Sequence, residues 1–316
     1  MRELRFTGLM MFGLLGTMVA SALTVQAQGI VVPGTGSVVQ KVGDDFEDPD
    51  WKYRYRLPKS THNLDERMNA PGGVALNGRW YEGVKRGQPD IVRRVETPAG
   101  GLPGSTGSLL LQSRNTGVPG KPSYKLQQDD FICAVHNRLG GSVRVSQSPS
   151  AVVRVFLPPV AKWESRNGPH FAFRVALETV AKKKSSGFFA SSKKEPEIYW
   201  PGLFIEKMRH RDGNDYAYFR VRSNRRGGDY KAKQITTTGW WTLGLSCTPD
   251  GRVHYFAKPG IEDLTKEDRI ASEYPYGYRA LRMKTFFFNV CSADDGRRWS
   301  TPWVIDDPTL YFVPTR

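Results

Sequence analysis

Short segments in which apolar and polar residues alternate dominate the chain after Val143. Side chains of a strand point alternately to its two faces, so this alternation predicts strands with one buried face. Turn residues separate the segments at intervals typical of a sandwich or barrel. The predicted strands are 151–157, 170–177, 203–208, 217–221, 241–246, 253–257, 285–290 and 303–312. No helical apolar repeat is sustained, so the pattern predicts an all-β fold.

The stretch from Trp51 to Gly120 differs, because it is dense in Pro, Gly, Asn and Arg. It contains one clear strand pattern, at 108–113, and several turn signals such as the pair Asn77 and Gly78. So much irregular chain is expected to run over the surface of the domain. We therefore predict a two-sheet antiparallel jelly-roll sandwich with long irregular N-terminal loops.

Three ranges complete the predicted organisation of the chain. A single β-sandwich domain is expected over 44–316, and a Gly- and Val-rich linker or edge segment precedes it at 28–43. A basic run of low complexity at 181–196 predicts a hairpin loop between two strands.

The N-terminus has the pattern of a secretory signal peptide. Arg2 and Arg5 give a basic start, and an apolar stretch follows from Leu9 to Val25. Small residues then stand at the recognition positions of a cleavage point that removes 1–27. An uncleaved anchor helix is the alternative, since the apolar stretch approaches the length that spans a bilayer. We expect removal and export to the periplasm, cell surface or extracellular space, with no membrane span afterwards.

The net charge of +15 makes polyanions the expected partners. The predicted signal peptide contributes one unit of this charge, so the exported chain keeps +14. Outside the cell, the available polyanions are acidic or sulfated polysaccharides and other envelope polymers. Nucleic acid is the less favoured partner, because export removes the chain from most of it.

The chain has three cysteines, Cys133, Cys247 and Cys291. In an oxidising compartment, one disulfide and one free thiol is the simplest arrangement. Cys247 and Cys291 each follow an apolar strand pattern and precede a turn, so we predict that these two pair. No two cysteines have a spacing typical of a zinc site.

Polar and aromatic side chains share one face of several predicted strands. In the strand 170–177, Phe171 and Phe173 point to one face, whereas His170 and Arg174 point to the other. If the strands lie in one sheet, these polar faces form a groove lined with cations and rings. Guanidinium groups pair with carboxylate or sulfate through two hydrogen bonds, which suits an acidic sugar chain. The predicted glycan-binding residues are Arg154, His170, Arg174, Glu206, Tyr218, Arg220, Arg222 and His254.

The same residues also fit the ordinary solvated face of a sandwich, where Arg and Tyr are common. A lyase needs a group that neutralises a uronate carboxylate, a base and an acid. His170, Arg174, Tyr218 and Arg220 provide those residue types. A hydrolase needs two carboxylates that flank the scissile bond, and Glu206 is the one well-placed strand carboxylate. If the protein is an enzyme, the sequence favours a lyase; it fixes no catalytic residue.

Two acidic clusters stand near the ends of the predicted domain. Asp45 and Glu47 belong to the first, and Asp306 and Asp307 belong to the second. If the terminal strands pair, these carboxylates predict a structural calcium site, because calcium prefers oxygen ligands. The alternative is that they cap turns and strand ends. No other cofactor is expected.

Several motifs are similar to those of one structural superfamily. They are the sequence GWWTLGLS at 239–246, PDGRVHY at 249–255, the closing WVIDDPTLY at 303–311, and DDFED at 44–48 followed by Trp51. The chain thereby resembles the concanavalin A-like lectin/glucanase superfamily near its laminin-G-like branch, and secreted bacterial proteins of that architecture. The resemblance implies a jelly roll; the superfamily includes lectins, hydrolases, lyases and adhesion modules.

The sequence therefore favours a secreted, non-catalytic carbohydrate-binding or cell-surface protein that prefers acidic polysaccharides. A polysaccharide lyase that acts on a glycan with uronic acids is the second interpretation. A structural envelope protein that binds a protein partner through the Arg-rich region 51–100 is the third.

Overall fold

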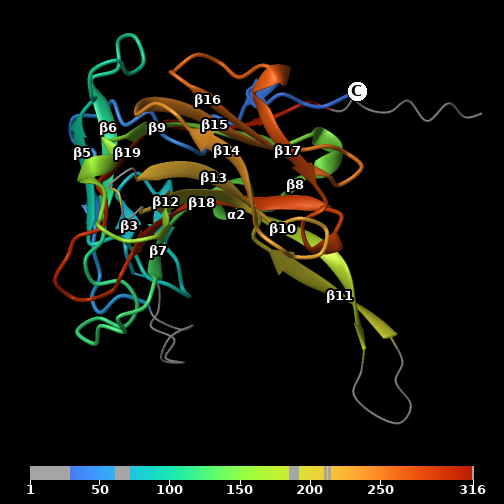
Figure 1. The fold of residues 1–316 in the computed structure, drawn as a ribbon. Helices are drawn as coiled ribbons and strands as arrows, with labels where there is room; N and C mark the ends of the chain where they lie inside the picture. Colours follow the sequence, from blue (N-terminus) through green and yellow to red (C-terminus); the bar gives the residue numbers. More distant parts are fainter. Residues whose placement is uncertain (1–28, 61–71, 185–191, 210–211, 213–214, 315–316) are drawn as a thin grey trace, which may run out of the picture.

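The computed structural model describes residues 29–60, 72–184, 192–209, 212 and 215–314. The predicted signal peptide lies outside these ranges. Among the described residues, no helix combines the length and the hydrophobicity that crossing a bilayer requires. Two antiparallel β-sheets pack face to face and form the body of the molecule (Figure 1), as the alternating pattern predicted.

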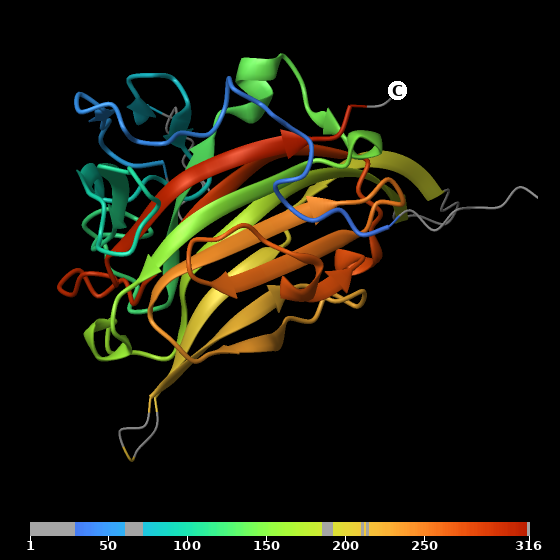
Figure 2. The ribbon, with the colours of Figure 1, turned by 90° about the horizontal axis from the view of Figure 1, so that it is seen from above.

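An eight-stranded sheet forms one layer of the sandwich. Its strands are β1 (Ser37–Val38), β5 (Ile91–Glu96), β6 (Gly107–Gln112), β9 (Ser150–Leu157), β15 (Gly239–Cys247), β16 (Val253–Pro259), β17 (Arg269–Glu273) and β19 (Trp303–Phe312). They are ordered β17-β16-β15-β9-β19-β6-β5, with β1 paired to β19. Figure 2 shows β9, β19, β15 and β16 running side by side across this layer.

An 11-stranded sheet forms the other layer. Its strands are β2 (Tyr53–Arg54), β3 (Val74–Ala75), β4 (Trp80–Glu82), β7 (Gln127–Cys133), β8 (Val143–Arg144), β10 (Gly168–Lys184), β11 (Ser192–Tyr199), β12 (Gly202–Met208), β13 (Tyr216–Arg222), β14 (Tyr230–Ile235) and β18 (Arg282–Ser292). They are ordered β14-β13-β12-β10-β18-β7-β4-β3-β2, with β11 paired to β10 and β8 to β18.

Helices are few and short in the described chain. They comprise α2 (Val135–Leu139) and the 3₁₀ turns η1 (Val145–Gln147), η2 (Val160–Lys162), η3 (Lys266–Asp268) and η4 (Pro275–Gly277). Each of them connects two strands.

Aromatic side chains fill the space between the two sheets. Trp80 stacks on Phe131 with 4.7 Å between ring centroids, and Phe173 stacks on Phe288 at 5.5 Å. All four rings have no exposed surface. Burial of such large rings provides much of the favourable free energy of folding and holds the strands rigidly. The outer face of each sheet can therefore carry polar groups in fixed positions.

The 11-stranded sheet curves around its outer face. Figure 1 shows β7 and β3 descending at one side of this layer and the β10–β11 hairpin extending at the other. Between these two sides, residues of β7, β10 and β18 line a hollow on the outer face of the sheet.

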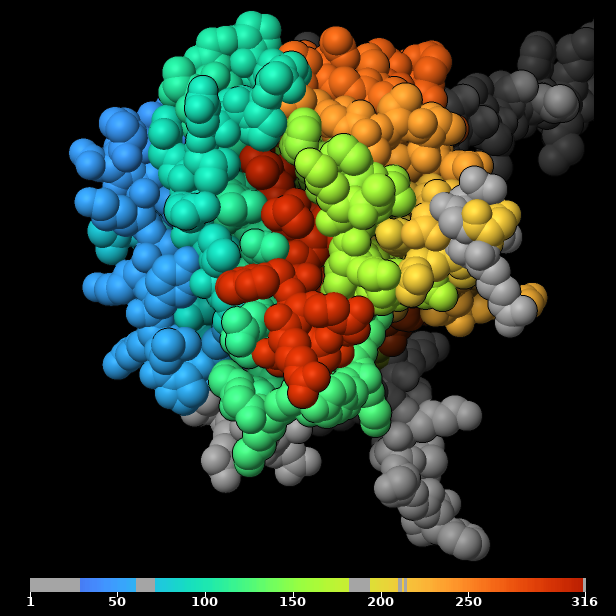
Figure 3. Space-filling view, turned by 60° about the vertical axis from the view of Figure 1, so that its left-hand side comes forward, coloured from blue at the N-terminus to red at the C-terminus, as the bar shows by residue number. Residues whose placement is uncertain are grey.

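Three connecting loops pack together at one end of the sandwich. Figure 3 shows the loop after β18 seated between the loops that follow β6 and β9. The amide of Ala293 donates to the Glu164 carboxylate at 2.9 Å, and the amide of Ser123 donates to Asp294 at 2.7 Å. The loops that follow β6, β9 and β18 are thus joined to one another by hydrogen bonds at this end of the sandwich.

The basic run at 181–196 is shorter as a loop than predicted. Residues 181–184 continue β10 and residues 192–196 begin β11, and the two strands pair in antiparallel register. Only 185–191 remain between them, and these residues lie outside the described part of the chain. β10 and β11 extend further than predicted because their backbones continue to pair where the apolar alternation has ended, and the prediction relied on that alternation.

Candidate functional site

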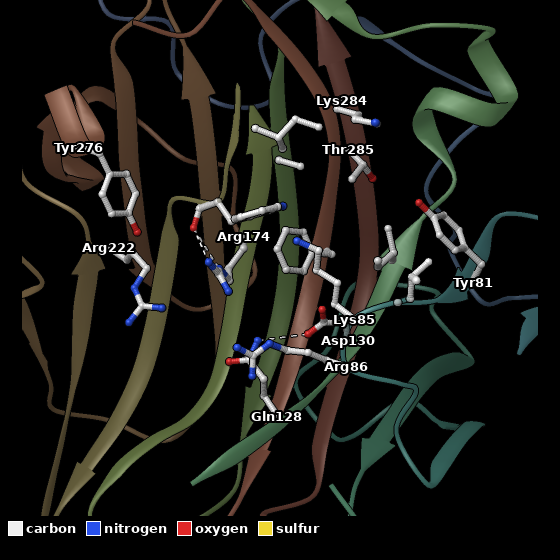
Figure 4. A pocket seen from close by; sticks show the side chains of 17 residues that line it. Tyr81, Lys85, Arg86, Gln128, Asp130, Arg174, Arg222, Tyr276, Lys284 and Thr285 are labelled. Carbon is white, nitrogen blue, oxygen red and sulfur yellow. Dashed lines mark hydrogen bonds between the residues drawn. The ribbon is translucent and has the colours of Figure 1, made fainter. Parts of the chain in front are cut away.

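A cavity of about 440 Å³ opens on the hollowed face of the 11-stranded sheet. Figure 4 shows Arg174 near its middle, with Arg222 and Tyr276 on one side and Lys85, Arg86 and Asp130 on the other. The polar and aromatic residues that line it are Tyr81, Lys85, Arg86, Gln128, Asp130, Arg174, Trp200, Arg222, Tyr276, Lys284, Thr285 and Phe287.

Arg174 forms the floor of this pocket. Its guanidinium lies 5.3 Å from the ring centre of Phe204 and 5.2 Å from that of Phe287. Its Nε donates to the carbonyl of Trp200 at 3.2 Å, Nη2 donates to the same oxygen, and Nη1 donates to Asn289 Oδ1 at 3.1 Å. Only 8% of Arg174 is exposed, and burial with nearby Arg222 lowers its pKa to about 10.

The charge of Arg174 has no direct counterion among the described residues. Both groups that accept its hydrogen bonds, a backbone carbonyl and an amide oxygen, are neutral. A buried charge is costly unless an opposite charge compensates it. The pocket floor therefore presents a buried cation on which an anion can be seated.

A chain of hydrogen bonds connects Arg174 to a buried carboxylate. Asn289 Nδ2 donates to Asp130 Oδ1 at 2.6 Å, and Gln128 Nε2 donates to the same oxygen at 3.2 Å. Burial raises the pKa of Asp130, and Arg86 and Arg174 partly offset this. Asn289 thus separates the carboxylate from the guanidinium and fixes the orientation of both.

Gly202 makes room for the Arg174 side chain. It lies opposite Arg174 in the register of β12 and β10. A Cβ at Gly202 would lie 2.4 Å from Arg174 Cγ and 2.6 Å from the carbonyl oxygen of Phe173. The missing side chain lets the guanidinium lie across the strand and reach the turn at Trp200.

Arg222 and Tyr276 form one wall of the pocket. Arg222 pairs with Asp229 at 2.7 Å and lies 4.7 Å from the ring centre of Phe204. Tyr276 has a left-handed backbone with a φ of 58°. Its amide donates to the carbonyl of Asn224 at 3.0 Å and to Ser223 Oγ at 3.1 Å, which holds the strained turn in place.

The opposite wall carries further cations. Lys85 and Arg86 come from the turn after β4, and Lys284 comes from β18. Together with Arg174 and Arg222, these residues give the lining five cationic side chains, whereas Asp130 is the one carboxylate among its described residues. The pocket is therefore strongly cationic, and its electrostatic potential favours anions.

The sequence prediction placed eight polar residues in one groove, and the structure divides them. Arg174 and Arg222 line the pocket. Glu206, Tyr218 and Arg220 lie on the same sheet beside it, where Tyr218 Oη donates to Glu206 and Arg220 Nη2 lies 2.8 Å from the same carboxylate oxygen. Glu206 is fully buried, and this cluster is an ion pair next to the pocket in which Glu206 Oε1 and Arg220 Nε have no hydrogen-bond partner among the described residues.

His170 does not reach the pocket, although it precedes Arg174 on β10. It is fully buried, with Nδ1 at 3.0 Å from Thr301 Oγ1 and Nε2 at 3.4 Å from the carbonyl of Arg166. Burial, together with nearby Arg166, lowers its pKa to about 2. The imidazole is thus neutral and closed to a ligand, which corrects the expectation that it binds glycan or acts as a base.

Arg154 and His254 lie in the other sheet. Arg154 on β9 pairs with Asp263 at 2.9 Å and with Asp307 at 3.1 Å. His254 on β16 lies between Ser272 and Thr248, and burial lowers its pKa to about 4. The predicted single groove is therefore wrong for these two residues, because alternation assigns a side chain to a face without identifying the sheet.

The four predicted calcium ligands do not converge. Asp45 and Asp307 line the same hollow of about 510 Å³. Glu47 instead accepts hydrogen bonds from Thr106, and buried Asp306 accepts one from Ser105. No group of three or more His, Cys, Asp or Glu side chains among the described residues is arranged to hold a metal ion. The two acidic clusters approach each other, but Glu47 and Asp306 accept hydrogen bonds from the loop residues Thr106 and Ser105.

The predicted disulfide is absent. Cys247 lies on β15 and Cys291 on β18, in different sheets, and both are free thiols. Cys133 is also free, and all three cysteines are buried. The prediction relied on similar positions at strand ends, which do not imply closeness in space.

Sequence reasoning missed several residues of the pocket. Asp130 and Gln128 belong to β7, whose polar sequence QQDDFIC hides its strand alternation. Trp200 and Tyr276 lie in turns, where no periodicity marks a side chain. The signal available in the sequence was the basic pair Lys85 and Arg86 between two glycines, Gly83 and Gly87, which marks a cationic turn.

Comparisons with known proteins find only distant similarity. No family model matches the sequence, and no curated protein matches it. Among solved structures, the chain is similar to an endo-β-1,4-glucuronan lyase from Trichoderma reesei, with a TM-score of 0.36, 14% identity, and coverage of 78% of this chain and 95% of that one.

Two further structures illustrate the same level of similarity. For the alginate lyase PA1167 from Pseudomonas aeruginosa, the TM-score is 0.34 at 9% identity, with coverage of 72% of this chain and 86% of that one. For the exoplasmic/lumenal domain of VIP36, the TM-score is 0.34 at 9% identity, with coverage of 75% of this chain and 86% of that one. Similarity at this level assigns no activity, so the functional argument rests on the pocket.

Proposed function

We propose that the protein binds an acidic polysaccharide on the hollowed face of its 11-stranded sheet, without changing it chemically. The observation that carries this proposal is the buried guanidinium of Arg174, whose hydrogen bonds go to neutral acceptors. A uronate carboxylate would provide the missing counterion. Arg86, Arg222 and Lys284 would attract the neighbouring charges of the same glycan.

The composition of the lining supports a sugar ligand. Trp200 and Tyr276 each expose 37% of their surface beside the cationic groups. Carbohydrate rings have apolar faces and polar edges, so a lining that combines rings with hydrogen-bond donors suits them. We further propose that the chain is exported, as its N-terminal pattern predicts, where such glycans occur.

Binding to immobilised polyuronates tests the proposal. Wild-type protein should bind polygalacturonate or polymannuronate and should not bind neutral dextran. Arg174→Gln should weaken binding roughly 30-fold or more, because it removes the buried partner of the carboxylate. Arg144→Gln is the matched control, since Arg144 is exposed on the short strand β8 and lies outside the pocket. Equal binding by wild type and Arg174→Gln would contradict the proposal.

A lyase is the second candidate, and Tyr276 is the observation that favours it. Its hydroxyl lies close enough to Arg174 and Arg222 for electrostatic interaction. In a β-elimination, a base removes the proton at C5 while an arginine neutralises the carboxylate. The C4–O bond then breaks, C4=C5 forms, and a proton goes to the leaving oxygen.

The geometry limits which residues can perform this chemistry. Tyr218 exposes 2% of its surface and binds Glu206, so it cannot serve as the predicted acid. Hydrolysis would require a second carboxylate, and Asp130 has none beside it among the described lining residues. Ultraviolet absorbance of an unsaturated product, lost in Tyr276→Phe, would establish the lyase; its absence with every polyuronate that binds would leave the binding function.

A further inference from the structure

Trp200 is hydrogen-bonded through its backbone to Arg174, the proposed anion-binding group of the pocket. It lies in the turn between β11 and β12, and its carbonyl accepts two hydrogen bonds from Arg174. Its indole lines the pocket and remains partly exposed. The backbone of one residue therefore holds the guanidinium, and its side chain presents a flat apolar surface beside it.

Lys85 covers this indole from the opposite wall. Its Nζ lies 4.8 Å from the centre of the Trp200 ring. Lys85 is exposed, and the structure shows no ion pair for it among the described residues. Figure 4 shows Lys85 on the side of the pocket that carries Arg86 and Asp130, across from Arg222 and Tyr276. The contact therefore joins segments that are distant in sequence and occupies the space above the ring.

We infer that Trp200 is the residue that selects a sugar ring, and that Lys85 shields it until the ligand arrives. The inference rests on the proposed binding of acidic glycans. A uronic acid residue would place its carboxylate on Arg174 and its apolar face on the indole, with Lys85 displaced toward the next carboxylate along the chain. A cation is held only weakly over an exposed ring, so displacement is inexpensive.

This arrangement separates two properties of the pocket. The cations alone attract any polyanion, whereas the indole adds affinity only when the anion is carried on a flat ring with an apolar face. A flexible inorganic polyanion such as polyphosphate has no such face. Trp200 should therefore matter for uronic acid oligosaccharides and not for polyphosphate.

Variants of Trp200 test the selection. Trp200→Ala should weaken binding of a uronate hexasaccharide about tenfold, because the buried apolar contact is lost. Trp200→Phe should recover most of this loss, and polyphosphate should bind all three proteins within about twofold. Equal losses for both ligands would show that Trp200 serves only to hold Arg174, and would overturn the inference.

Variants of Lys85 test the shielding. Lys85→Met and Lys284→Met each remove one cation of the pocket, but Lys85 alone lies over the indole. If Lys85 shields the ring, its replacement should weaken hexasaccharide binding about two- to fivefold less than the replacement of Lys284, since the contact no longer has to be broken. Equal weakening by the two variants would contradict shielding.

Failure of the inference can be distinguished from failure of the proposed function. If wild-type protein binds no polyuronate, the proposed function fails. If it binds polyuronate through Arg174 while the Trp200 variants bind as wild type does, the function stands and the inference fails. A change of tryptophan fluorescence on hexasaccharide binding, lost in Trp200→Phe, would support the inference independently.

Discussion

The position of the Arg174 guanidinium depends on one absent methyl group. Gly202 faces Arg174 across the strands, and a Cβ there would overlap the arginine side chain and the Phe173 carbonyl. The two groups cannot both keep their positions if a side chain is added. Moving the arginine side chain relieves only the overlap with its Cγ. The overlaps with the Phe173 carbonyl oxygen and with Arg174 Cα, at 2.6 and 2.9 Å, are with backbone, so the two strands must also shift against the core beneath them.

We predict that Gly202→Ala weakens polyuronate binding about tenfold and also lowers the free energy of unfolding by about 1–3 kcal/mol, because the added Cβ overlaps backbone as well as side chain. The expected cause is the displacement of Arg174 from its two neutral acceptors. A binding isotherm measured with the same polyuronate, together with circular dichroism, checks this. Gly141→Ala is the control, since a Cβ at Gly141 meets nothing within 4 Å. Unchanged affinity in Gly202→Ala would show that the arginine can be accommodated elsewhere.

His170 makes stability depend on pH. Its pKa is about 2 in the folded chain, compared with an ordinary value of 6.5. Between these values the unfolded chain binds a proton that the folded imidazole does not. The contribution of neutral His170 is therefore complete above pH 6.5 and is lost as the pH falls below it, by about 1.4 kcal/mol per pH unit.

We predict that His170→Gln removes this pH dependence. Urea unfolding at about pH 6.5, 5.5 and 4.5 should show the stability of wild type falling relative to the variant by about 1.4 kcal/mol per unit. The slope is the informative quantity, since the substitution also shifts the variant's stability by an amount that does not depend on pH. His136→Gln, at an exposed position of α2, should leave the slope unchanged. Parallel curves for wild type and His170→Gln would refute the explanation.

Residue types alone identified part of the candidate site. Arg174 and Arg222 could be predicted because each lies on the polar face of a strongly alternating strand. Arg154 and His254 satisfy the same rule, yet they lie on the outer side of the other sheet. Strand order is set by pairing between segments distant in sequence, and alternation contains no information about that pairing.

At the scale of elements, the strands with a clear apolar face were predictable. The final strand, 303–312, coincides with β19, and the other predicted strands lie within or nearly within observed ones. The strands that were missed have weak alternation, as in β14, or carry polar residues on both faces, as in β7. These strands are stabilised by tertiary context, which local pattern does not reveal.

Two turns cooperate to hold Tyr276 over the pocket. Asn224 Oδ1 accepts hydrogen bonds from the amides of Arg226 and Gly228 at 2.9 and 3.0 Å. The carbonyl oxygen of Asn224 accepts a hydrogen bond from the amide of Tyr276. The turn between β13 and β14 thus supports the strained turn between β17 and β18.

We predict that Asn224→Ala loosens both turns. Loss of two hydrogen bonds should lower the free energy of unfolding by about 1–2 kcal/mol, and affinity for polyuronate should fall because Tyr276 is no longer held in place. Urea unfolding and the binding isotherm measure the two effects. Lower stability with unchanged affinity would mean that the Tyr276 wall makes no contact with the ligand.

At the scale of the whole molecule, the excess of 46 Lys and Arg over 31 Asp and Glu acts together with the pocket. Such an excess accelerates the approach of a polyanion, whereas the pocket determines where it is seated. Many of the basic side chains, such as Arg54, Arg93 and Arg225, are exposed, so added salt screens them.

We predict that polyuronate affinity falls at least about tenfold between roughly 0.05 and 0.5 M sodium chloride. Arg174→Gln should reduce affinity at both salt concentrations, because its partner would be bound in a buried site that is screened less. Binding measured by titration at several ionic strengths tests both statements. Affinity that is independent of salt would exclude an electrostatic basis for binding.

The three buried thiols determine how the protein is oxidised during storage. Burial raises the pKa of Cys133, Cys247 and Cys291 to about 12, so the folded chain offers almost no thiolate to an oxidant. Once the chain is unfolded in air, an odd number of thiols favours cross-links between molecules. Refolding yield should therefore rise when a reductant is present, and a maleimide should label no cysteine of the native protein and all three in denaturant. Shelf life is then governed by how often the sandwich opens, a kinetic rather than an equilibrium quantity.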